Sequence, residues 1–184
     1  MRVISGKARG KKLVSLEGLN TRPTLDRVKE AMFNIIQYDI IGKDVLDLFA
    51  GSGALGIEAL SRGANKAIFC DNSAEAIKII KTNIENTRNL EQSEILNKDY
   101  ITALKHLAES NKRFDIIFLD PPYETDFAEK AIKEILDLNL LSKDGMIILE
   151  TDDTKKEEAL KAQKIEIFDK RKYGRVILIF IRKE

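Results

Sequence analysis

The sequence predicts an α/β fold of the Rossmann-like type, with a mostly parallel seven-stranded sheet, an antiparallel C-terminal hairpin and a basic N-terminal arm. From residue 43, apolar runs of strand length alternate with amphipathic helical stretches, which is typical of a parallel sheet covered on both faces. Residues 164–182 instead form two apolar runs around Tyr173-Gly174, which indicates a hairpin. We therefore expect an arm over residues 1–40 that packs on a body over residues 41–184.

The arm begins with two short apolar patches, Val3-Ile4 and Leu13-Val14, on either side of a segment rich in glycine and cations, residues 6–12. This pattern predicts a basic β-hairpin with a flexible tip, whose glycines let the backbone approach phosphates closely. A helix with an apolar stripe is expected after Arg22-Pro23, with Thr24 as its N-cap and its end near residues 38–42.

The body elements follow from the alternation of apolar runs. Strands are expected at residues 44–49, 66–71, 94–97, 114–120 and 144–150. Helices are expected at residues 54–62, 73–88, 100–110 and 126–138, with a weaker one near 154–161. The antiparallel hairpin is expected to pair residues 164–168 with residues 175–182.

Length and composition limit the possible classes of protein. A chain of 184 residues with 43% apolar and 33% charged residues fits one globular domain with a real core. No apolar run approaches the roughly 20 residues of a membrane span, and the first residues show no signal-peptide pattern. The single cysteine, Cys70, permits no internal disulfide and offers no metal cluster. We expect a cytoplasmic monomer without a metal or a membrane partner.

Charge is unevenly distributed although the net charge is only +1. Residues 1–30 hold eight Lys and Arg against three Asp and Glu, and the rest of the chain holds 23 against 27. A basic arm on a slightly acidic body is typical of a protein that binds a polyanion, and a solvated lysine-rich surface is the alternative. The cations that we expect to contact RNA are Arg2, Lys7, Arg9, Lys11, Lys12 and Arg22.

The most informative stretch runs from Phe114 to Tyr123, where a buried-strand pattern stops at Asp120-Pro121-Pro122-Tyr123. Ligands bind at the carboxyl ends of strands in open α/β sheets. Asp120 offers a carboxylate there, the two prolines leave nearby carbonyls without a competing N–H donor, and Tyr123 offers a flat ring. This arrangement suits a planar substrate with an exocyclic amine, so we expect these four residues to form the catalytic motif. A strand terminator with a solvated aspartate is the structural alternative.

A glycine loop links the first body strand to its helix. Gly51, Gly53 and Gly56 satisfy the spacing G-x-G-x-x-G, and Asp71 ends the next strand, which taken literally is a dinucleotide fingerprint. Asp47 argues against a pyrophosphate ligand, because a carboxylate just before the loop repels phosphate and attracts a cation. S-adenosylmethionine carries an ammonium and a sulfonium but no phosphate, so it is the cofactor that we expect.

Acids at three successive strand ends would line the cofactor crevice. Asp47 would hold the methionine end, Asp71 the ribose hydroxyls and Asp99 the adenine amine, whereas helix N-caps and surface acids are the structural alternatives. The expected cofactor-binding residues of the body are Asp47, Phe49, Ala50, Gly51, Ser52, Gly53, Gly56, Asp71, Asn72, Ser73, Asp99 and Tyr100.

With both sites in view, the sequence resembles the class I S-adenosylmethionine-dependent methyltransferases with an Asp-Pro-Pro-Tyr motif, and more closely the RsmD (YhhF/YlbH) family. The glycine loop, within the matching stretch of residues 47–64, and Asp120-Pro-Pro-Tyr are shared with many amino-methylating enzymes. The specific likeness lies in the arm, residues 2–13, and in the helix motif, residues 21–34, with Tyr173-Gly174 near the end. The resemblance therefore runs nearly end to end.

This resemblance implies methyl transfer from S-adenosylmethionine to the exocyclic N2 of a guanine in small-subunit (16S) ribosomal RNA, within the subunit or its assembly intermediate. Asp120 and the Pro121 carbonyl would accept the amine hydrogens, and Tyr123 would stack on a base taken out of its helical context. Thr24 and Arg27, carried over from the helix motif, would lie near the methionine end of the cofactor. The target nucleotide is not identified.

Other functions compete with this one. A DNA adenine-N6 or cytosine-N4 methyltransferase shares Asp-Pro-Pro-Tyr, but so short a chain leaves no room for a target-recognition domain. A nicotinamide-dependent oxidoreductase fits the glycine spacing but explains neither Asp47 nor Asp120. A non-catalytic RNA-binding or assembly factor on a methyltransferase fold is opposed by the intact set of Asp47, Asp71 and Asp120.

Four further features receive structural interpretations. His106 is expected to be a structural or surface histidine, and Cys70 a small apolar residue of the core. The charged run from Glu150 to Glu158 is expected to be solvated, and Glu58 is interpreted as a contact of the glycine loop.

Overall fold

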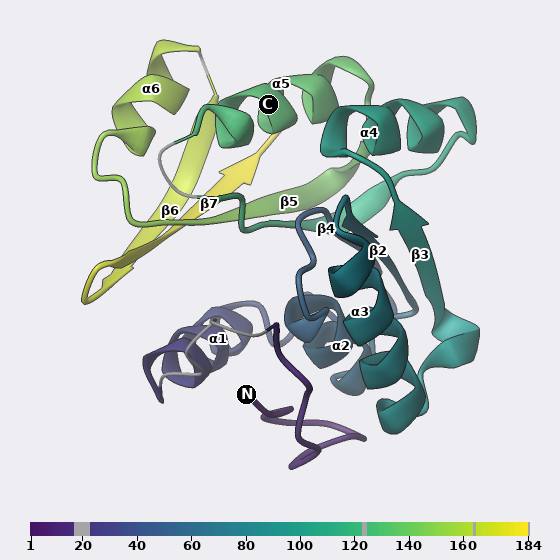
Figure 1. Cartoon of the computed structure of the whole chain (residues 1–184). Helices are drawn as coiled ribbons and strands as arrows, with labels where there is room; N and C mark the ends of the chain where they lie inside the picture. Colours follow the sequence, from purple (N-terminus) through teal and green to yellow (C-terminus); the bar gives the residue numbers. More distant parts are fainter. Residues whose placement is uncertain (17–22, 123–124, 164, 184) are drawn as a thin grey trace.

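A computed structural model describes residues 1–16, 23–122, 125–163 and 165–183, with side chains of the first helix from residue 26 onward (Figure 1). Seven strands form one sheet in the order β3-β2-β1-β4-β5-β7-β6. The parallel strands are β1 (Asp44–Asp47), β2 (Lys66–Asp71), β3 (Ser93–Asn97), β4 (Phe114–Leu119) and β5 (Leu141–Thr151). The hairpin strands β6 (Glu166–Tyr173) and β7 (Val176–Arg182) are antiparallel, and β7 lies against β5. The expected fold class is confirmed.

Helices cover both faces of this sheet (Figure 1). One face carries α1 (Pro23–Ile35), α2 (Ala54–Ser61) and α3 (Ala74–Thr87), and the other carries α4 (Tyr100–Glu109), α5 (Phe127–Asp137) and α6 (Lys156–Ala162). A short 3₁₀ helix, Leu90–Gln92, leads into β3. Among the described residues, no helix is both long and apolar enough to cross a membrane.

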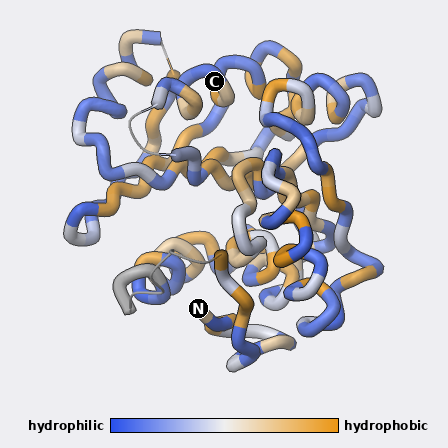
Figure 2. Tube along the Cα trace, in the orientation of Figure 1, coloured by the Kyte–Doolittle hydropathy of each residue, from blue (hydrophilic) through white to orange (hydrophobic). Residues whose placement is uncertain are grey.

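Two hydrophobic cores result from the alternation of side chains along the strands. Val45, Ile116 and Ile148 point into the core under α1–α3, whereas the residues that follow them point into the core under α4–α6. Figure 2 shows the apolar residues concentrated along the strands and the polar ones on the outer sides of the helices. Because the central strands are buried on both faces, their sequences are continuously apolar.

The structure corrects several sequence expectations about element ends. α1 ends at Ile35 and not near residues 38–42, β1 ends at Asp47 and not at residue 49, and β6 continues to Tyr173 instead of ending at residue 168. β5 begins at Leu141 rather than residue 144, because Phe114 pairs with Leu141 and the register then shifts so that Ile116 pairs with Met146. The polar residues inside this irregular segment conceal the strand. α1 begins at Pro23, so Thr24 lies in the first turn and not at the N-cap. Proline suits that position because its missing N–H has no partner within the helix.

The N-terminal hairpin is present, but its tip is docked and not flexible as expected. An antiparallel bridge joins Arg2 to Lys12, and the tip donates two backbone hydrogen bonds to Ser61 at the end of α2, from Lys7 N to the carbonyl at 2.8 Å and from Ala8 N to Oγ at 2.9 Å. Gly6 has a φ of +83°, and a Cβ there would lie 1.8 Å from the Ser61 carbonyl oxygen. The close contact therefore requires glycine.

Candidate functional site

Four acidic residues mark the carboxyl edge of the sheet. Asp71 ends β2, Asp47 ends β1, Asp120 follows β4 and Glu150 lies near the end of β5, and these four strands are neighbours in this order. Alternation along β1 and β4 places Asp47 and Asp120 on the α1–α3 face, as it does Val45 and Phe118. The end of the glycine-loop strand β1 and the end of the Asp-Pro-Pro strand β4 therefore lie side by side, as the sequence predicts.

Asp47 is 2% exposed, and its Oδ2 accepts a hydrogen bond from Gly56 N at 3.0 Å. It caps α2 from a neighbouring strand, because the N-cap residue Gly53 has no side chain to do so. Desolvation by burial raises the pKa of Asp47 to about 7, and the charges of Asp120 and Asp71 add to this rise. A cationic ligand would offset both effects, so the site suits the ammonium and sulfonium of S-adenosylmethionine.

The glycine loop has the conformation that its sequence predicts. Gly51 and Gly53 have φ of +55° and +77°, in the left-handed region. Gly56 serves packing, because a Cβ there would lie 2.3 Å from the ring of Phe69 on β2. α2 consequently packs close to the sheet, which positions the loop over the ends of β1 and β2.

Asp71 fixes this loop through both of its carboxylate oxygens. Oδ2 accepts from Gly51 N at 2.9 Å, and Oδ1 accepts from Ser73 N at 2.9 Å. Ser73 in turn caps α3, with its Oγ accepting from Ala76 N at 3.3 Å, and Asn72 beside it is exposed. The ribose contact of Asp71 stays a prediction, and the residue also has a structural function that the sequence did not reveal.

Asp99 caps α4, with Oδ1 accepting from Thr102 N at 3.0 Å. Hydrogen bonds from the side chain and the backbone of Thr102 lower the pKa of the Asp99 carboxyl. Its contact with adenine stays a prediction. Next to it, Tyr100 packs against Phe49, with ring centroids 5.3 Å apart, and against Phe127 at 5.1 Å. Phe127, which no sequence motif indicated, completes a half-buried aromatic cluster at this edge of the sheet. Such a cluster suits the flat face of a base.

Asp120 is open to solvent, but the crowded strand ends around it desolvate its carboxyl and raise the pKa to about 6. Pro121 after it is buried. Thr125 Oγ1 donates to the Pro122 carbonyl at 2.8 Å, whereas no hydrogen bond to the Pro121 carbonyl occurs in the described part of the chain. Asp120 and the Pro121 carbonyl are thus two available acceptors. Tyr123 lies outside the described residues.

The charged run from Glu150 to Glu158 is not uniformly solvated, so that expectation is wrong for two of its members. Glu150 and Lys156 are each 8% exposed. Lys156 Nζ donates to the Thr125 carbonyl and to Glu129 Oε1, both at 2.8 Å. It therefore joins α6 to the start of α5 and to the segment that follows the Asp-Pro-Pro motif, a role that the local sequence does not indicate.

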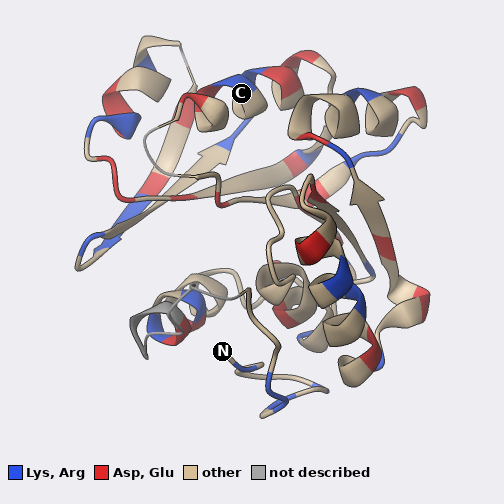
Figure 3. Cartoon of the chain, viewed as in Figure 1, with Lys and Arg blue, Asp and Glu red and all other residues tan. Residues whose placement is uncertain are grey.

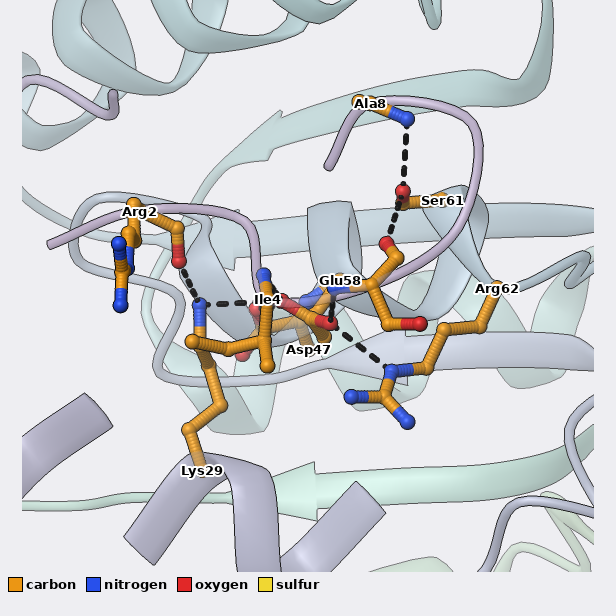
Figure 4. A network of polar contacts seen from close by, with 10 residues as sticks. Arg2, Ile4, Ala8, Lys29, Asp47, Glu58, Ser61 and Arg62 are labelled. Carbon is orange, nitrogen blue, oxygen red and sulfur yellow. Dashed lines mark hydrogen bonds and ion pairs between the residues drawn. The ribbon is translucent and has the colours of Figure 1, made fainter. Parts of the chain in front are cut away.

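Glu58 contacts the arm and not the glycine loop, which corrects its sequence interpretation (Figure 4). It is fully buried on α2, and its carboxylate accepts from Ile4 N at 2.8 Å and Ser5 N at 3.0 Å. It also pairs with Lys29 of α1 at 3.1 Å and with Arg62 at 2.8 Å. Desolvation by burial lowers the pKa of Lys29, and Glu58 counteracts this change. The carboxylate of Glu58 therefore connects the hairpin and α1 to α2.

A buried asparagine on α3 makes a second connection that the sequence analysis missed. Asn83 Oδ1 accepts from Val14 N at 2.8 Å, and its Nδ2 donates to the carbonyls of Val14 and Ser52, each at 2.9 Å. Because Ser52 belongs to the glycine loop, this amide links the arm directly to the expected cofactor site.

The cations of the hairpin are exposed, and Figure 3 shows basic residues along this N-terminal segment. Arg2 and Arg9 line a cleft of about 420 Å³ together with Arg27, Asp26 and Glu30 of α1. No residue of the glycine loop lines it, so Arg27 lies with the arm cations. Within the described residues, none of the arm cations in the hairpin forms an ion pair. Arg22 and the side chain of Thr24 lie outside the described residues.

The opposite edge of the sheet has a different character. A cavity of about 290 Å³ lies there at the amino ends of the strands, lined by apolar residues and by charges of both signs, and none of the expected site residues borders it. His106 is exposed on α4 and Cys70 is fully buried, as expected. Among the described residues, no group of three or more His, Cys, Asp or Glu could hold a metal ion.

The raised carboxyl pKa values predict how stability depends on pH. Desolvation raises the pKa of Asp47 to about 7 and that of Glu150 to about 8, whereas both titrate near 4 in the unfolded chain. The folded protein thus binds more protons than the unfolded chain between these values. We expect the free energy of unfolding of the ligand-free protein to fall from pH 5 to pH 8, by about 3 kcal/mol for each of the two groups. Urea unfolding at both pH values measures this, and Asp47→Asn should reduce the slope; a flat or rising profile would contradict it.

Comparison with known proteins gives a consistent result. The family model described as Conserved hypothetical protein 95 matches residues 1–182. YlbH of Bacillus subtilis (strain 168) is 42% identical over 83% of this chain and 83% of its own. Ribosomal RNA small subunit methyltransferase D of Haemophilus influenzae is 39% identical over 84% of this chain and 80% of its own. The solved structure of yhhF from Escherichia coli superposes with a TM-score of 0.86 at 30% identity, covering 100% of this chain and 98% of that one.

Proposed function

The chain belongs to the family described as Conserved hypothetical protein 95, the RsmD family, and from this membership we propose that it methylates the N2 amine of a guanine in small-subunit ribosomal RNA. The observation that carries the proposal is the position of Asp120-Pro121-Pro122 at the end of β4, directly beside the glycine-loop strand β1 that ends in Asp47. A site for an aromatic amine thus adjoins a site for a cationic cofactor. The name of the Haemophilus influenzae relative supports ribosomal RNA as the substrate.

The cofactor is S-adenosylmethionine, and when bound it supplies a methyl group on a positively charged sulfur. Asp47 suits the ammonium of its methionine part, because this buried carboxylate has a raised pKa and no hydrogen bond to its Oδ1 within the described residues. Asp71 and Asp99 are proposed to hold the ribose and the adenine, with the aromatic cluster of Phe49, Tyr100 and Phe127 as an apolar wall.

The residues at the end of β4 make the amine reactive. The lone pair of an aromatic amine is delocalised into its ring, so the nitrogen is a poor nucleophile. When Asp120 and the Pro121 carbonyl accept its two hydrogens, the nitrogen can rehybridise and direct its lone pair at the methyl carbon. Formation of the N–C bond would accompany cleavage of the S–C bond, and Asp120 would stabilise the positive charge that develops on nitrogen. The proton leaves after transfer, and Tyr123 is proposed to stack on the base.

Residues 1–40 are proposed to act as an RNA-binding arm on a methyltransferase body, residues 41–184. The exposed cations of the hairpin and the cleft that holds Arg2, Arg9 and Arg27 support this role, because phosphates bind where several cations converge. The docked hairpin keeps these cations in fixed positions relative to the glycine loop. We propose that the enzyme works in the cytoplasm as a monomer, on a small subunit or its assembly intermediate.

Neutralising Lys7, Arg9, Lys11 and Lys12 to glutamine should weaken RNA binding and reduce its salt dependence. Each phosphate that the arm no longer neutralises lowers the slope of log K against log salt by about 0.7–0.9, so four such phosphates account for a change of about 3. Fluorescence anisotropy with ribosomal RNA fragments at several salt concentrations measures the slope. The control neutralises four exposed lysines outside the arm, Lys66, Lys78, Lys81 and Lys105. Equal effects of the two sets of substitutions would show that the arm is an ordinary solvated surface and not an RNA-binding site.

The function itself is tested by transfer of isotopically labelled methyl from S-adenosylmethionine. The substrates are small ribosomal subunits that lack the modification, naked ribosomal RNA and duplex DNA, each followed by nucleoside mass analysis. Label in N2-methylguanosine from subunits or RNA is the expected result and also identifies the substrate state. Label in DNA as N6-methyladenine or N4-methylcytosine would overturn the RNA assignment. Cofactor binding without transfer to any substrate would favour a non-catalytic RNA-binding protein.

A further inference from the structure

Glu150 near the end of β5 is the neighbour of Asp120. β4 and β5 are parallel and pair Leu119 with Leu149, so the next residues of the two strands stand beside each other. Phe118 and Ile148 point into the core under α1–α3, and Leu119 and Leu149 point into the other core. Alternation therefore returns both Asp120 and Glu150 to the α1–α3 face, where the amine site is proposed.

Glu150 is 8% exposed, yet its carboxylate makes no hydrogen bond or ion pair with any described residue. The residue opposite it on β7 is Leu178, which offers no polar side chain. Lys156, the buried cation of the same run, is held by Glu129 and the Thr125 carbonyl. Desolvation together with the charge of Asp120 raises the pKa of Glu150 to about 8. The Glu150 carboxyl is not among the fully buried, unpartnered groups of the described residues, so a ligand at these strand ends could reach it as an acceptor.

The chemistry of the bases shows which ligand has such a donor. Guanine carries a ring N1–H directly beside its N2 amine, so both groups donate along one edge. Adenine and cytosine carry a ring nitrogen beside their amines that only accepts. When the amine is held at Asp120, the ring nitrogen beside it faces the neighbouring strand end. In guanine this nitrogen presents an N–H donor, whereas in adenine and cytosine it presents a lone pair.

We propose that Glu150 accepts the N1–H of the target guanine while Asp120 accepts its N2 amine, so that two adjacent strand ends select guanine over adenine and cytosine. The inference rests on the proposed function and adds the residue that determines base specificity. A site built to bond an N–H rejects an analogue without it, because its own buried polar group is then left unpaired. Above its pKa of about 8, the ionised carboxylate of Glu150 would in addition face a lone pair on adenine or cytosine.

The test uses the base analogue 2-aminopurine, which keeps the C2 amine but has an unprotonated N1. Small subunits are reconstituted with RNA that carries guanosine or 2-aminopurine riboside at the nucleotide found by the mass analysis. Above pH 8, where Glu150 is ionised, we expect wild-type kcat/KM to favour guanosine by about 100-fold or more. In Glu150→Gln the amide NH₂ can donate to the bare N1, so the preference should shrink to about tenfold or less, with transfer to 2-aminopurine rising in absolute rate.

Asp152→Asn is the matched control, because this acid lies two residues further on and is exposed. It should keep the wild-type preference, and both variants should bind S-adenosylhomocysteine within about threefold of wild type. An unchanged preference in Glu150→Gln would overturn the inference and leave the proposed function standing. If that variant does not fold, the wild-type enzyme is a sufficient test by itself, because equal transfer to guanosine and 2-aminopurine riboside would also overturn the inference. Failure of the wild type to methylate guanosine would instead refute the proposed function.

Discussion

Replacing Asp120 by alanine is expected to lower kcat of methyl transfer by about 1000-fold or more, while the Kd of S-adenosylmethionine changes less than about threefold. The reason is a division of roles between neighbouring strands. We propose that Asp120, directly after β4, holds the amine, whereas Asp47 on β1 and the glycine loop hold the cofactor. Single-turnover transfer and calorimetric titration with the cofactor measure the two quantities separately. Asp120→Asn keeps one oxygen acceptor without the charge and should fall between alanine and wild type.

A second readout distinguishes this role from a structural one. The Asp120 charge helps to raise the pKa of Asp47 and of Glu150, so its removal should increase the stability of the ligand-free protein at pH 8. Asp126→Ala, at an exposed acid before α5, serves as the control and should change neither activity nor stability appreciably. Loss of cofactor binding and transfer together in Asp120→Ala would contradict the division of roles.

Replacing Glu58 by alanine is expected to lower the free energy of unfolding by about 3–5 kcal/mol. The substitution leaves Lys29, which is 4% exposed, as a buried cation without its carboxylate, and it removes the acceptor of two backbone N–H groups of the hairpin. For a chain of this length the melting temperature should fall by roughly 10 °C. Glu85→Ala on the exposed side of α3 is the control, and we expect it to stay within about 0.5 kcal/mol.

Glycine substitutions test the same connection without removing a charge. Gly6→Ala would place its Cβ 1.8 Å from the Ser61 carbonyl oxygen, whereas Gly10→Ala has a similar φ of +82° and no atom within 4 Å. Both variants share the backbone strain, so any additional loss of stability or RNA binding in Gly6→Ala measures the contribution of the docking of the hairpin on α2. RNA binding should weaken more in Gly6→Ala than in Gly10→Ala. Equal behaviour of the two variants would mean that docking contributes little to the arm.

The sequence by itself determined the order and type of the elements, because burial on both faces makes parallel strands continuously apolar and gives helices a single apolar stripe. It also located Asp47, the glycine loop and Asp120-Pro121-Pro122, since each depends on residue types at fixed short spacing. The end of a strand and the tight turn after it are local properties. Local chemistry is therefore sufficient to predict them.

The tertiary structure alone decided which of the remaining charges are buried and with what they pair. Glu58 and Arg62 have the spacing of an ordinary surface pair on a helix, but the hairpin covers them from more than fifty residues away. Asn83 and Lys156 similarly find their partners on distant segments. Glu150 stands beside Asp120 only because β4 and β5 pair in one particular register. Register, docking and burial depend on contacts between residues far apart in the chain, so no local pattern encodes them.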